Sequence, residues 1–387
     1  MVCNSGEPEK SRRPREECDR QNKKRGTYMK KFVSVLLALC MIFALASCGN
    51  KDDNKGAAGG SGKLVIYSPN SDTQIESSLR AFERAYPNIT VELQSMGTGD
   101  VLARIEAEKD NPQADINWGA INYNFYEQHP DLWEEYVSPN EKLLDENYRN
   151  HAGYVSFGNL SGSGAFILND DLLAELGVEV KGYADLLNPK LKGKIAMGDP
   201  TASSSAFAEL TNMLLVMGEG ATADECYHSD KAWKYIEDFV ANLDGIILSS
   251  SSAVYKNVVA GEYAVGVSYE DPVVQAVIDN KDNPDANISM VYPEEGAVWL
   301  PAGVAIVKNA PNMENAKLFV DFMLSEECQK ELAKTTIRGT ITTIDQDCEG
   351  MLPFSEIKMA YEDQAAVAAY QSEMLDKWTS ILTRYAK

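Results

Sequence analysis

The chain has 387 residues, a length that suggests two or three domains, and its apolar content of 44% is ordinary for a globular protein. It is strongly acidic: 36 basic against 58 acidic side chains give a net charge of −22, and outside residues 1–47 the balance is 26 against 53, or −27. A body this acidic repels phosphate backbones, so we expect no nucleic-acid partner. A small anionic ligand is not excluded, because local backbone donors outweigh a distant net charge.

The first part of the chain has the layout of an export signal. Residues 1–28 are hydrophilic and without periodicity, and we interpret them as a misassigned start or a disordered extension. Residues 29–47 begin with Met29 and two lysines, continue with an apolar run of 15 residues and end on small residues. Such a run is short for a helix that must span a hydrocarbon layer of ~30 Å, so we predict a secretory signal peptide.

Cys48 closes this signal in the sequence Leu45-Ala46-Ser47-Cys48, which resembles the bacterial lipobox. The resemblance implies that Cys48 is acylated and anchors the mature protein on the outer side of the cell membrane. The alternative is a cleavage site of small residues with an incidental cysteine. Residues 48–62 are rich in Gly, Asn, Lys and Asp, a composition that predicts a flexible tether.

Strands and helices alternate after the tether. Apolar residues between Ile75 and Tyr86 recur with the 3.6-residue period of a helix, and Ser71 with Gln74 forms a capping box at its start. The order of elements predicts parallel strands with right-handed crossovers, and hence an α/β domain. The expected elements are strand 63–67, helix 72–86, strand 90–93, a helix through Val101, Leu102 and Ile105, and strand 114–118.

The alternating pattern recurs in the second half and predicts another α/β unit. The last helix, at about 365–382, is amphipathic and finishes the chain. The other elements expected in the second half are strand 194–197, a helix through Phe207, Leu210, Leu214 and Leu215, helix 232–243, strand 245–248, helix 254–260, strand 263–268, strands 288–292 and 303–307, and helix 313–333.

Five segments in this order resemble the family 1 extracellular solute-binding proteins of ABC importers, and together they cover nearly all of residues 63–387. They are LVIYSPN at 64–70 and the segments 95–120, 199–210, 261–273 and 301–327. The resemblance implies the type II periplasmic-binding-protein fold, with two α/β lobes joined by crossing strands and a ligand in the interlobe cleft. The closest subgroups are those for phosphonates, for sugar phosphates and for ferric iron.

The resemblance also implies lobes that are discontinuous in sequence. We expect lobe 1 at 63–160, with about 272–310 returning to it. We expect lobe 2 at 161–271, with part of 311–387 packing across both lobes. Expected partners are a small solute, a permease with its ATPase, and the membrane through the lipid anchor; we expect a monomer without a cofactor.

Ligands of open parallel sheets bind beyond the carboxyl ends of the strands, which directs attention to four turns here. Helix N-termini at two of them offer free N–H groups and partial positive charge, which suit phosphate, phosphonate or carboxylate. Each residue also has a structural interpretation: the Ser and Thr residues as helix caps, the glycines as turn formers, Trp118 as core. The candidates are Ser68, Asn70, Thr98, Gly99, Trp118, Thr201, Ser203, Ser204 and Ser205.

Tyr269, Glu270 and Asp271 follow the strand 263–268. Their carboxylates could bind an amine or the hydroxyls of a solute, or they could simply be the acidic first turn of a helix. The resemblance to the iron subgroup implies two adjacent tyrosines at about this point, but here one tyrosine precedes two acids. Ferric iron therefore stays as the alternative ligand, with these three residues as its oxygen donors.

Few features favour other classes of protein. The body contains Cys226, Cys328 and Cys348, which allow at most one disulfide; there is no CxxC motif and the chain has three scattered histidines, so we predict no zinc site. The sequence contains no GxSxG, HExxH or P-loop motif, which leaves a secreted hydrolase lipoprotein as a third interpretation. We therefore predict a lipid-anchored substrate-binding component of an ABC importer that takes a small anionic solute and is not an enzyme.

Overall fold

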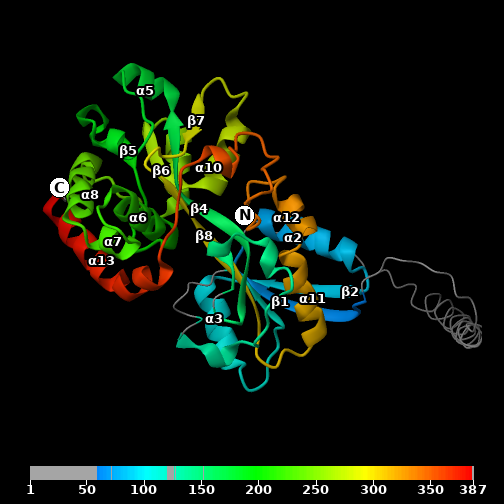
Figure 1. The fold of residues 1–387 in the computed structure, drawn as a ribbon. Helices are drawn as coiled ribbons and strands as arrows, with labels where there is room; N and C mark the ends of the chain where they lie inside the picture. The colour runs from blue at the N-terminus through cyan, green and yellow to red at the C-terminus, as the bar shows by residue number, and fades with distance from the viewer. Residues whose placement is uncertain (1–58, 71, 120–125, 127, 151, 386–387) are drawn as a thin grey trace, which may run out of the picture. The chain divides into compact units, whose positions relative to one another are not determined.

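The computed structural model describes residues 59–70, 72–119, 126, 128–150 and 152–385 (Figure 1). The predictions for residues 1–28, for the signal at 29–47, for Cys48 and for the Ser71 capping box lie outside the described residues. Within the described part, no helix has the length and apolar content needed to cross a membrane.

A single mixed sheet of nine strands runs through the structure, in the order β2-β1-β3-β8-β4-β6-β5. Two further strands lie off this path, because β7 pairs with β4 and β9 pairs with β8. The strands are β1 Gly62–Ser68, β2 Ile89–Ser95, β3 Ile116–Trp118, β4 Val155–Asn169, β5 Ile195–Ala196, β6 Val265–Tyr269, β7 Ile288–Val291, β8 Ala297–Ile306 and β9 Met359–Ala360.

Helices cover the sheet on both faces. The α-helices are α2 Asp72–Ala85, α3 Thr98–Ala107, α5 Asp170–Leu176, α6 Ser204–Met217, α7 Ala223–His228, α8 Asp230–Leu243, α9 Ser251–Val259, α10 Glu270–Asn280, α11 Met313–Met323, α12 Glu326–Leu332 and α13 Gln364–Tyr385. Short 3-10 helices span Pro130–Leu132, Glu141–Leu143, Glu146–Tyr148, Ala184–Leu187, Pro189–Leu191 and Phe354–Glu356.

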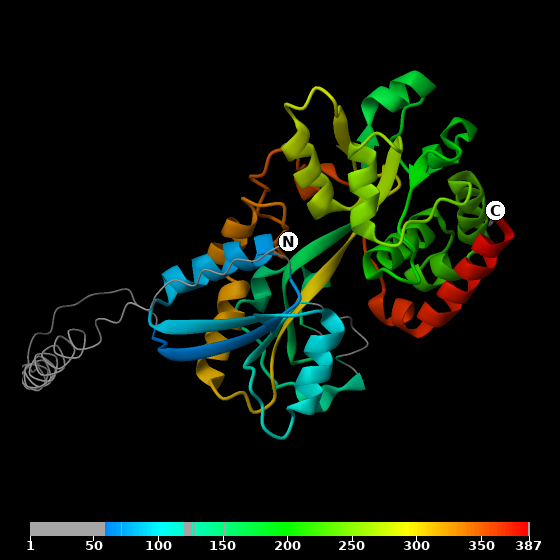
Figure 2. The ribbon, with the colours of Figure 1, turned by 180° about the vertical axis from the view of Figure 1, so that it is seen from behind.

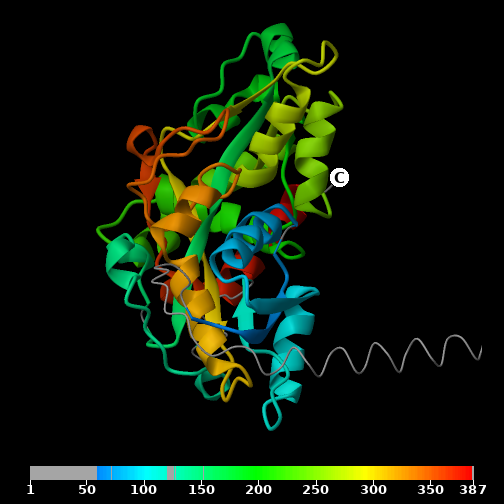
Figure 3. The same ribbon diagram turned by 90° about the vertical axis from the view of Figure 1, so that its right-hand side faces the viewer.

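The first lobe is built on the parallel strands β1, β2 and β3, with one end of β8 beside β3. Figure 3 shows α3 and α11 on opposite sides of these strands. One core joins Leu64 and Ile66 of β1 to Phe82 of α2 and Phe319 of α11, and a second core lies on the other face around Val65 and Tyr67. Because successive side chains of a strand point to opposite faces, β1 is apolar on both.

The second lobe is built on β5, β6, β7 and the far end of β4. Phe166 and Leu168 of β4 belong to a core formed with α6, α8 and α13, whereas Ile167 packs on the opposite face with Val258 of α9 and Val273 of α10. The alternation along β4 thus separates two helical layers. Figure 2 shows α13 beside α8 in this lobe.

The strands β4 and β8 connect the lobes and pair with each other in antiparallel fashion (Figure 1). In the first lobe, Val155–Phe157 of β4 pairs with Gly303–Ala305 of β8; in the second, Ala165–Leu168 pairs with β6. Register shifts interrupt β4 between Phe157 and Asn159 and between Ser163 and Ala165.

The structure departs from the predicted elements at several points. The sequence did not indicate β4, and segment 245–248 is no strand: in this described segment only Leu248 makes an isolated bridge, to Gly198. Helix 313–333 is two helices, because α11 ends at Met323 and Ser325 caps α12 by accepting a hydrogen bond from the N–H of Cys328. The return to lobe 1 also comes later than residue 272, since α10 packs on β4 and β7 in the second lobe and the chain crosses back along β8.

Candidate functional site

A cavity of about 820 Å³ lies where the two lobes and the crossing strands meet. Small-molecule sites typically have volumes of roughly 300–1,000 Å³. The first lobe, the crossing strands, the second lobe and α13 all contribute to its wall. The lining residues are Pro69, Asn70, Asn159–Ser163, Pro200–Ser205, Phe207, Ala208, Thr211, Tyr269–Asp271, Leu300–Ala302, Thr336, Ile337, Glu362, Gln364, Val367, Ala368, Gln371 and Leu375.

Most of the residues predicted for ligand binding meet at this cavity. The members that line it are Asn70, Thr201, Ser203, Ser204, Ser205, Tyr269, Glu270 and Asp271. Ser68, Gly99 and Trp118 do not line it, and the side chain of Thr98 lies outside what the structure describes.

Ser68 and Trp118 form part of the first-lobe core. The Ser68 hydroxyl donates to the carbonyl of Trp118 at 2.7 Å and accepts from the N–H of Asn70 at 3.1 Å. The Trp118 ring is fully buried and packs edge-on against Phe319, with ring centroids 5.6 Å apart. The prediction that Trp118 stacks on a ligand is therefore wrong for this structure, because core side chains enclose the ring.

In the turn before α3, the glycines Gly97 and Gly99 do not line the cavity. Thr98 is the first residue of α3, and Gly97 precedes it with an extended backbone and no side-chain cap. Gly99 is exposed, and a Cβ atom placed on it would meet nothing within 4 Å. The assignment of this turn to an anionic ligand stays a prediction.

Asn70 is one polar residue that the first lobe contributes to the cavity wall. It follows β1 and packs tightly on Gly119, where a Cβ would lie 1.9 Å from its Oδ1; Gly119 also has a positive φ of 94°. A glycine is thus needed at 119 for steric and backbone reasons. The Asn70 Nδ2 group is buried and has no hydrogen-bond partner among the described residues.

Three serine hydroxyls join the starts of α6 and α9 in the second lobe. The Oγ atoms of Ser203 and Ser205 lie 3.1 Å apart, and Ser251 Oγ lies 2.8 Å from the first and 2.7 Å from the second. Ser203 is the N-cap of α6, and Ser251 is the first residue of α9. Two helix N-termini therefore meet beside the cavity, together with three hydroxyls, of which those of Ser203 and Ser205 belong to lining residues and Ser251 lies behind them.

Ser251 was missed from the sequence. The only signal was the run of four serines at 249–252 ahead of a predicted helix. Tertiary packing brings Ser251 next to Ser203 and Ser205. At Gly198 a Cβ would lie 3.0 Å from the Cβ of Ala206 and 3.3 Å from Ser251 Oγ. The absence of a side chain at Gly198 lets α6 and α9 approach each other.

Thr201 is held by an acidic side chain. Its hydroxyl donates to Asp199 Oδ1 at 2.8 Å, and its backbone N–H donates to the same oxygen at 2.9 Å. The Thr201 hydroxyl hydrogen therefore points at Asp199, whereas the side-chain partners of the nearby Ser203, Ser205 and Ser251 hydroxyls among the described residues are one another.

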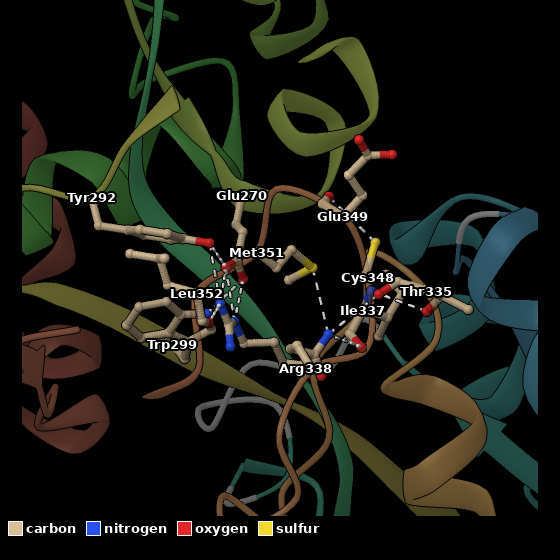
Figure 4. A network of polar contacts seen from close by, with 11 residues as sticks. Glu270, Tyr292, Trp299, Thr335, Ile337, Arg338, Cys348, Glu349, Met351 and Leu352 are labelled. Carbon is tan, nitrogen blue, oxygen red and sulfur yellow. Dashed lines mark hydrogen bonds and ion pairs between the residues drawn. The ribbon is translucent and has the colours of Figure 1, made fainter. Parts of the chain in front are cut away.

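Glu270, the first residue of α10, is the centre of a buried ion pair (Figure 4). Arg338 contacts its carboxylate with Nη2–Oε1 at 2.7 Å, and the Tyr292 hydroxyl and the Trp299 indole N–H donate to it at 2.5 and 2.8 Å. The Arg338 guanidinium also lies 4.4 Å from the ring centroid of Phe354. With these donors on its two oxygens, Glu270 is engaged by the protein itself, and no sequence pattern indicated Arg338 as its partner.

Tyr269 and Asp271 flank Glu270 and both line the cavity. Burial raises the pKa of Tyr269 to about 12, with further contributions from Tyr255, Asp271 and Glu209. Burial also raises the pKa of Asp271, although the hydroxyl of Thr336, which donates to this carboxylate, acts in the opposite direction. At neutral pH the Tyr269 phenol is therefore protonated and available as a donor.

A polar wall formed by the start of α13 was also missed. Glu362, just before this helix, accepts a hydrogen bond on Oε2 from the Thr211 hydroxyl of α6 at 2.6 Å. Burial raises the pKa of Glu362 to about 7; the Thr211 hydrogen bond lowers it and Asp363 raises it. Glu362 and Thr211 lie 151 residues apart, so no local pattern could have indicated their contact.

Metal ligands and cysteines are the remaining groups to consider. In the part of the chain that the structure describes, no group of three or more His, Cys, Asp or Glu side chains is placed to hold a metal ion. Cys226, Cys328 and Cys348 are all free thiols, which settles the pairing that the sequence left open.

The profile of the bacterial extracellular solute-binding proteins matches residues 78–346. The chain belongs to this family. The resemblance seen in the sequence is thereby confirmed, and so is the two-lobed α/β fold, because solved periplasmic binding proteins superimpose on it.

Three known proteins place this solute-binding protein among its relatives. The periplasmic binding protein AfuA from Actinobacillus pleuropneumoniae, solved with fructose 6-phosphate, is 28% identical, with a TM-score of 0.64 over 84% of this chain and 99% of that chain. A Salmonella typhimurium periplasmic protein, whose name proposes 2-aminoethylphosphonate as its ligand, is 24% identical over 80% of this chain and 87% of its own. Iron uptake protein A1 of Synechocystis sp. is 24% identical over 78% and 84%, respectively.

The solute-binding protein is the substrate-binding component of an ABC importer, and such components work with a permease and an ATPase. Its family is exported to the periplasm or the cell surface. Family and fold are those of binding proteins rather than of enzymes.

Proposed function

We propose that this protein captures a small anionic solute, a phosphonate such as 2-aminoethylphosphonate or a phosphorylated small molecule, and delivers it to its permease. The observation that carries the proposal is the meeting of α6 and α9 at the Ser203–Ser205–Ser251 hydroxyl cluster beside the cavity. The starts of helices provide free N–H groups and partial positive charge, which together favour a phosphoryl or phosphonyl group.

The electrostatics of the whole chain do not oppose this assignment. The net charge outside residues 1–47 is −27, but exposed charges further away than about 8–10 Å are largely screened at physiological salt. Donors within hydrogen-bond distance act in a partly water-excluded cavity, where each hydrogen bond is stronger than it is in water. The bound state of AfuA with fructose 6-phosphate, at 28% identity, supports a phosphorylated solute.

Lobe closure would couple binding to delivery. Asn70 contributes from the first lobe, whereas the serine cluster and Tyr269 belong to the second. A ligand that contacts both lobes stabilises the state in which they are close, and so shifts the population toward it. The permease would then recognise the closed state, and the protein would release its solute unchanged, as a monomer and without enzymatic turnover.

Attachment to the membrane is part of the proposal. Acylation of Cys48 with two or more chains would hold the protein at the outer side of the membrane, and residues 49–62 would serve as the tether. Metabolic labelling with a radioactive fatty acid, in the wild type and in Cys48→Ser, tests this; equal labelling of both would exclude a lipid at Cys48.

Ferric iron is the alternative that the relative in Synechocystis supports. Iron(III) requires hard anionic oxygen ligands. Of the three residues considered for it, Glu270 is engaged by Arg338, Tyr292 and Trp299, so Tyr269 and Asp271 remain. The anionic solute is therefore the better supported ligand.

Isothermal titration calorimetry tests the proposal with inorganic phosphate, fructose 6-phosphate, 2-aminoethylphosphonate and ferric citrate. We expect at least one phosphoryl or phosphonyl compound to bind, and Ser205→Ala, which removes a hydroxyl that lines the cavity, to weaken it about tenfold, since a hydrogen bond to a charged group contributes roughly 1.5–3 kcal/mol. Ser372→Ala on the exposed face of α13 is the matched control. Binding of ferric citrate alone, or equal affinities for wild type and Ser205→Ala, would refute the anion site; 31P NMR checks that the ligand is not consumed.

A further inference from the structure

Glu362 occupies a defined place along the wall of the cavity. Its partner Thr211 lies seven residues after Ser204, the first residue of α6, on the same helix. At a rise of 1.5 Å per residue the two levels are about 10 Å apart along α6. The cavity is thus lined by an anion-binding helix end at one level and by an acidic acceptor at another.

The Glu362 carboxyl group has capacity for a further donor. Thr211 donates to Oε2, and Oε1 has no hydrogen-bond partner among the described residues. Thr211 is completely buried, and its hydroxyl also lies 3.0 Å from the carbonyl oxygen of Ala208. When Glu362 is ionised, Thr211 donates to it; when Glu362 is protonated, it can donate to Thr211, which then donates to Ala208.

The position of Glu362 changes which acid we expect to contact the end of the ligand remote from its anionic group. Glu270 was the candidate from the sequence, but its carboxylate is saturated by Arg338, Tyr292 and Trp299. Glu362 has one neutral partner and no cation within ion-pair distance among the described residues. It is therefore the better placed acid for recognising an O–H or N–H group of a solute.

We propose that Glu362, positioned by Thr211, accepts a hydrogen bond from the end of the solute remote from its anionic group, and that it selects phosphorylated polyhydroxy compounds over short aminoalkylphosphonates. The inference rests on the proposed anion site at α6. It assigns the chemistry of the second end and the length of the ligand, which the anion site alone does not.

The two ligand classes differ in length. In 2-aminoethylphosphonate only two carbon atoms lie between phosphorus and nitrogen, a span of roughly 4–5 Å, and one hydrogen bond of about 2.8 Å extends its reach to about 7 Å. A hexose phosphate places hydroxyls about 8–9 Å from phosphorus, which reaches about 11 Å with the same hydrogen bond. The levels of Ser204 and Thr211, about 10 Å apart, match the longer compound.

The test compares three ligands by calorimetry: fructose 6-phosphate, inorganic phosphate and 2-aminoethylphosphonate. In the wild type we expect fructose 6-phosphate to bind most tightly. Glu362→Gln should weaken fructose 6-phosphate about tenfold and leave inorganic phosphate within about twofold, because only the sugar reaches residue 362. Glu373→Gln, which removes the same charge from the exposed face of α13, should change neither.

The pH dependence gives a readout that a purely structural role would not produce. Two titratable groups face Glu362: Asp363 on its own segment and Tyr227 of α7. Burial raises the pKa of Tyr227, so its phenol does not ionise between pH 6 and 8. The ratio of affinities for fructose 6-phosphate over inorganic phosphate should rise between pH 6 and 8 as Glu362 ionises, and stay flat in Glu362→Gln. Thr211→Val should move this rise to higher pH, because the hydrogen bond that lowers the pKa is lost.

The outcomes distinguish the two levels of the argument. If none of the three compounds binds, the proposed anion site fails and this inference with it. If fructose 6-phosphate and inorganic phosphate weaken equally in Glu362→Gln, the anion site stands and Glu362 has no selective role. If 2-aminoethylphosphonate binds more tightly than fructose 6-phosphate, the assignment of the ligand class is overturned.

Discussion

Arg338 and Glu270 form an ion pair that is almost completely removed from water, with 1% and 2% of their side-chain surfaces exposed and 2.7 Å between Nη2 and Oε1. The pair joins the start of α10 to the segment after α12, and Arg338 also bridges in backbone register to Leu160 on β4. It thus lies where the crossing strand, the second lobe and the C-terminal segment come together (Figure 4).

Replacing Arg338 should be among the most destabilising single changes in the chain. Arg338→Ala leaves the Glu270 carboxylate buried without its counter-charge, a situation that typically costs 3–5 kcal/mol of unfolding free energy. Urea denaturation at pH 7 measures the effect. The exposed pair Lys330–Glu326 offers a control, because Lys330→Ala should cost at most about 1 kcal/mol.

The double variant Arg338→Met/Glu270→Gln refines this prediction. It removes both charges together, so we expect it to be more stable than Arg338→Ala alone. A loss below about 1 kcal/mol in Arg338→Ala would contradict the importance of the buried pair.

Glu209 should make the protein less stable as the pH rises. Its side chain is 1% exposed, neither carboxyl oxygen has a hydrogen-bond partner among the described residues, and burial raises its pKa well above the ordinary value. The native state therefore keeps a proton that the unfolded state releases above about pH 4.5, so stability is full below that pH and falls above it.

Glu209→Gln removes this proton linkage. The free energy of unfolding of the variant minus that of the wild type should increase between pH 5 and 8, by up to about 1.4 kcal/mol per pH unit. Urea denaturation at several pH values measures the difference, with the exposed Glu219→Gln as control. A pH-independent difference would show that Glu209 is ionised in the folded protein.

Tyr269 allows a direct test of the iron alternative. Burial raises its pKa to about 12, and Glu270 beside it is engaged, so we expect no ferric tyrosinate to form. Added ferric citrate should produce no visible charge-transfer absorption in the wild type. A band that appears in the wild type and disappears in Tyr269→Phe would instead favour iron.

Cys328 should be protected from alkylation in the folded protein. It is completely buried, and burial raises the pKa of its thiol to about 12, which suppresses the reactive thiolate. Iodoacetamide labelling mapped by mass spectrometry should modify Cys226 and Cys348, which are partly exposed, well before Cys328. In urea the three rates should converge; rapid labelling of Cys328 under native conditions would indicate that α12 opens locally.

The sequence predicted those parts of the fold whose information is local. The helices at 72–86 and 232–243 carry a clear apolar period, and α2 and α8 lie there. The strand β4 was missed because its middle reads Leu160-Ser161-Gly162-Ser163-Gly164, and glycine and serine give little strand signal. Its extended conformation depends on pairing with β8, whose partner residues lie about 140 positions away in the chain.

The same limit applies to the cavity. The Ser203–Ser205 turn was predicted because it follows a strand and opens a helix, which is a local feature. Arg338, Ser251 and Glu362 reach their partners through contacts across 68, 46 and 151 residues, respectively. Single-sequence patterns do not report such distances, so the acid expected to recognise the solute was placed at Glu270.

The two lobes have strands in common, and this sets how they can move. Neither lobe could be produced as a separately folding fragment, because a cut within β4 or β8 would leave the part of the sheet in each lobe without an inner strand. Any change of angle between the lobes must bend the hydrogen-bonded pair of strands β4 and β8, which resists bending more than a flexible loop would. The pairing of β4 with β6 is irregular between Ser163 and Ala165, where Gly164 has a positive φ of 83°, so the angle between the lobes depends on the backbone at this point.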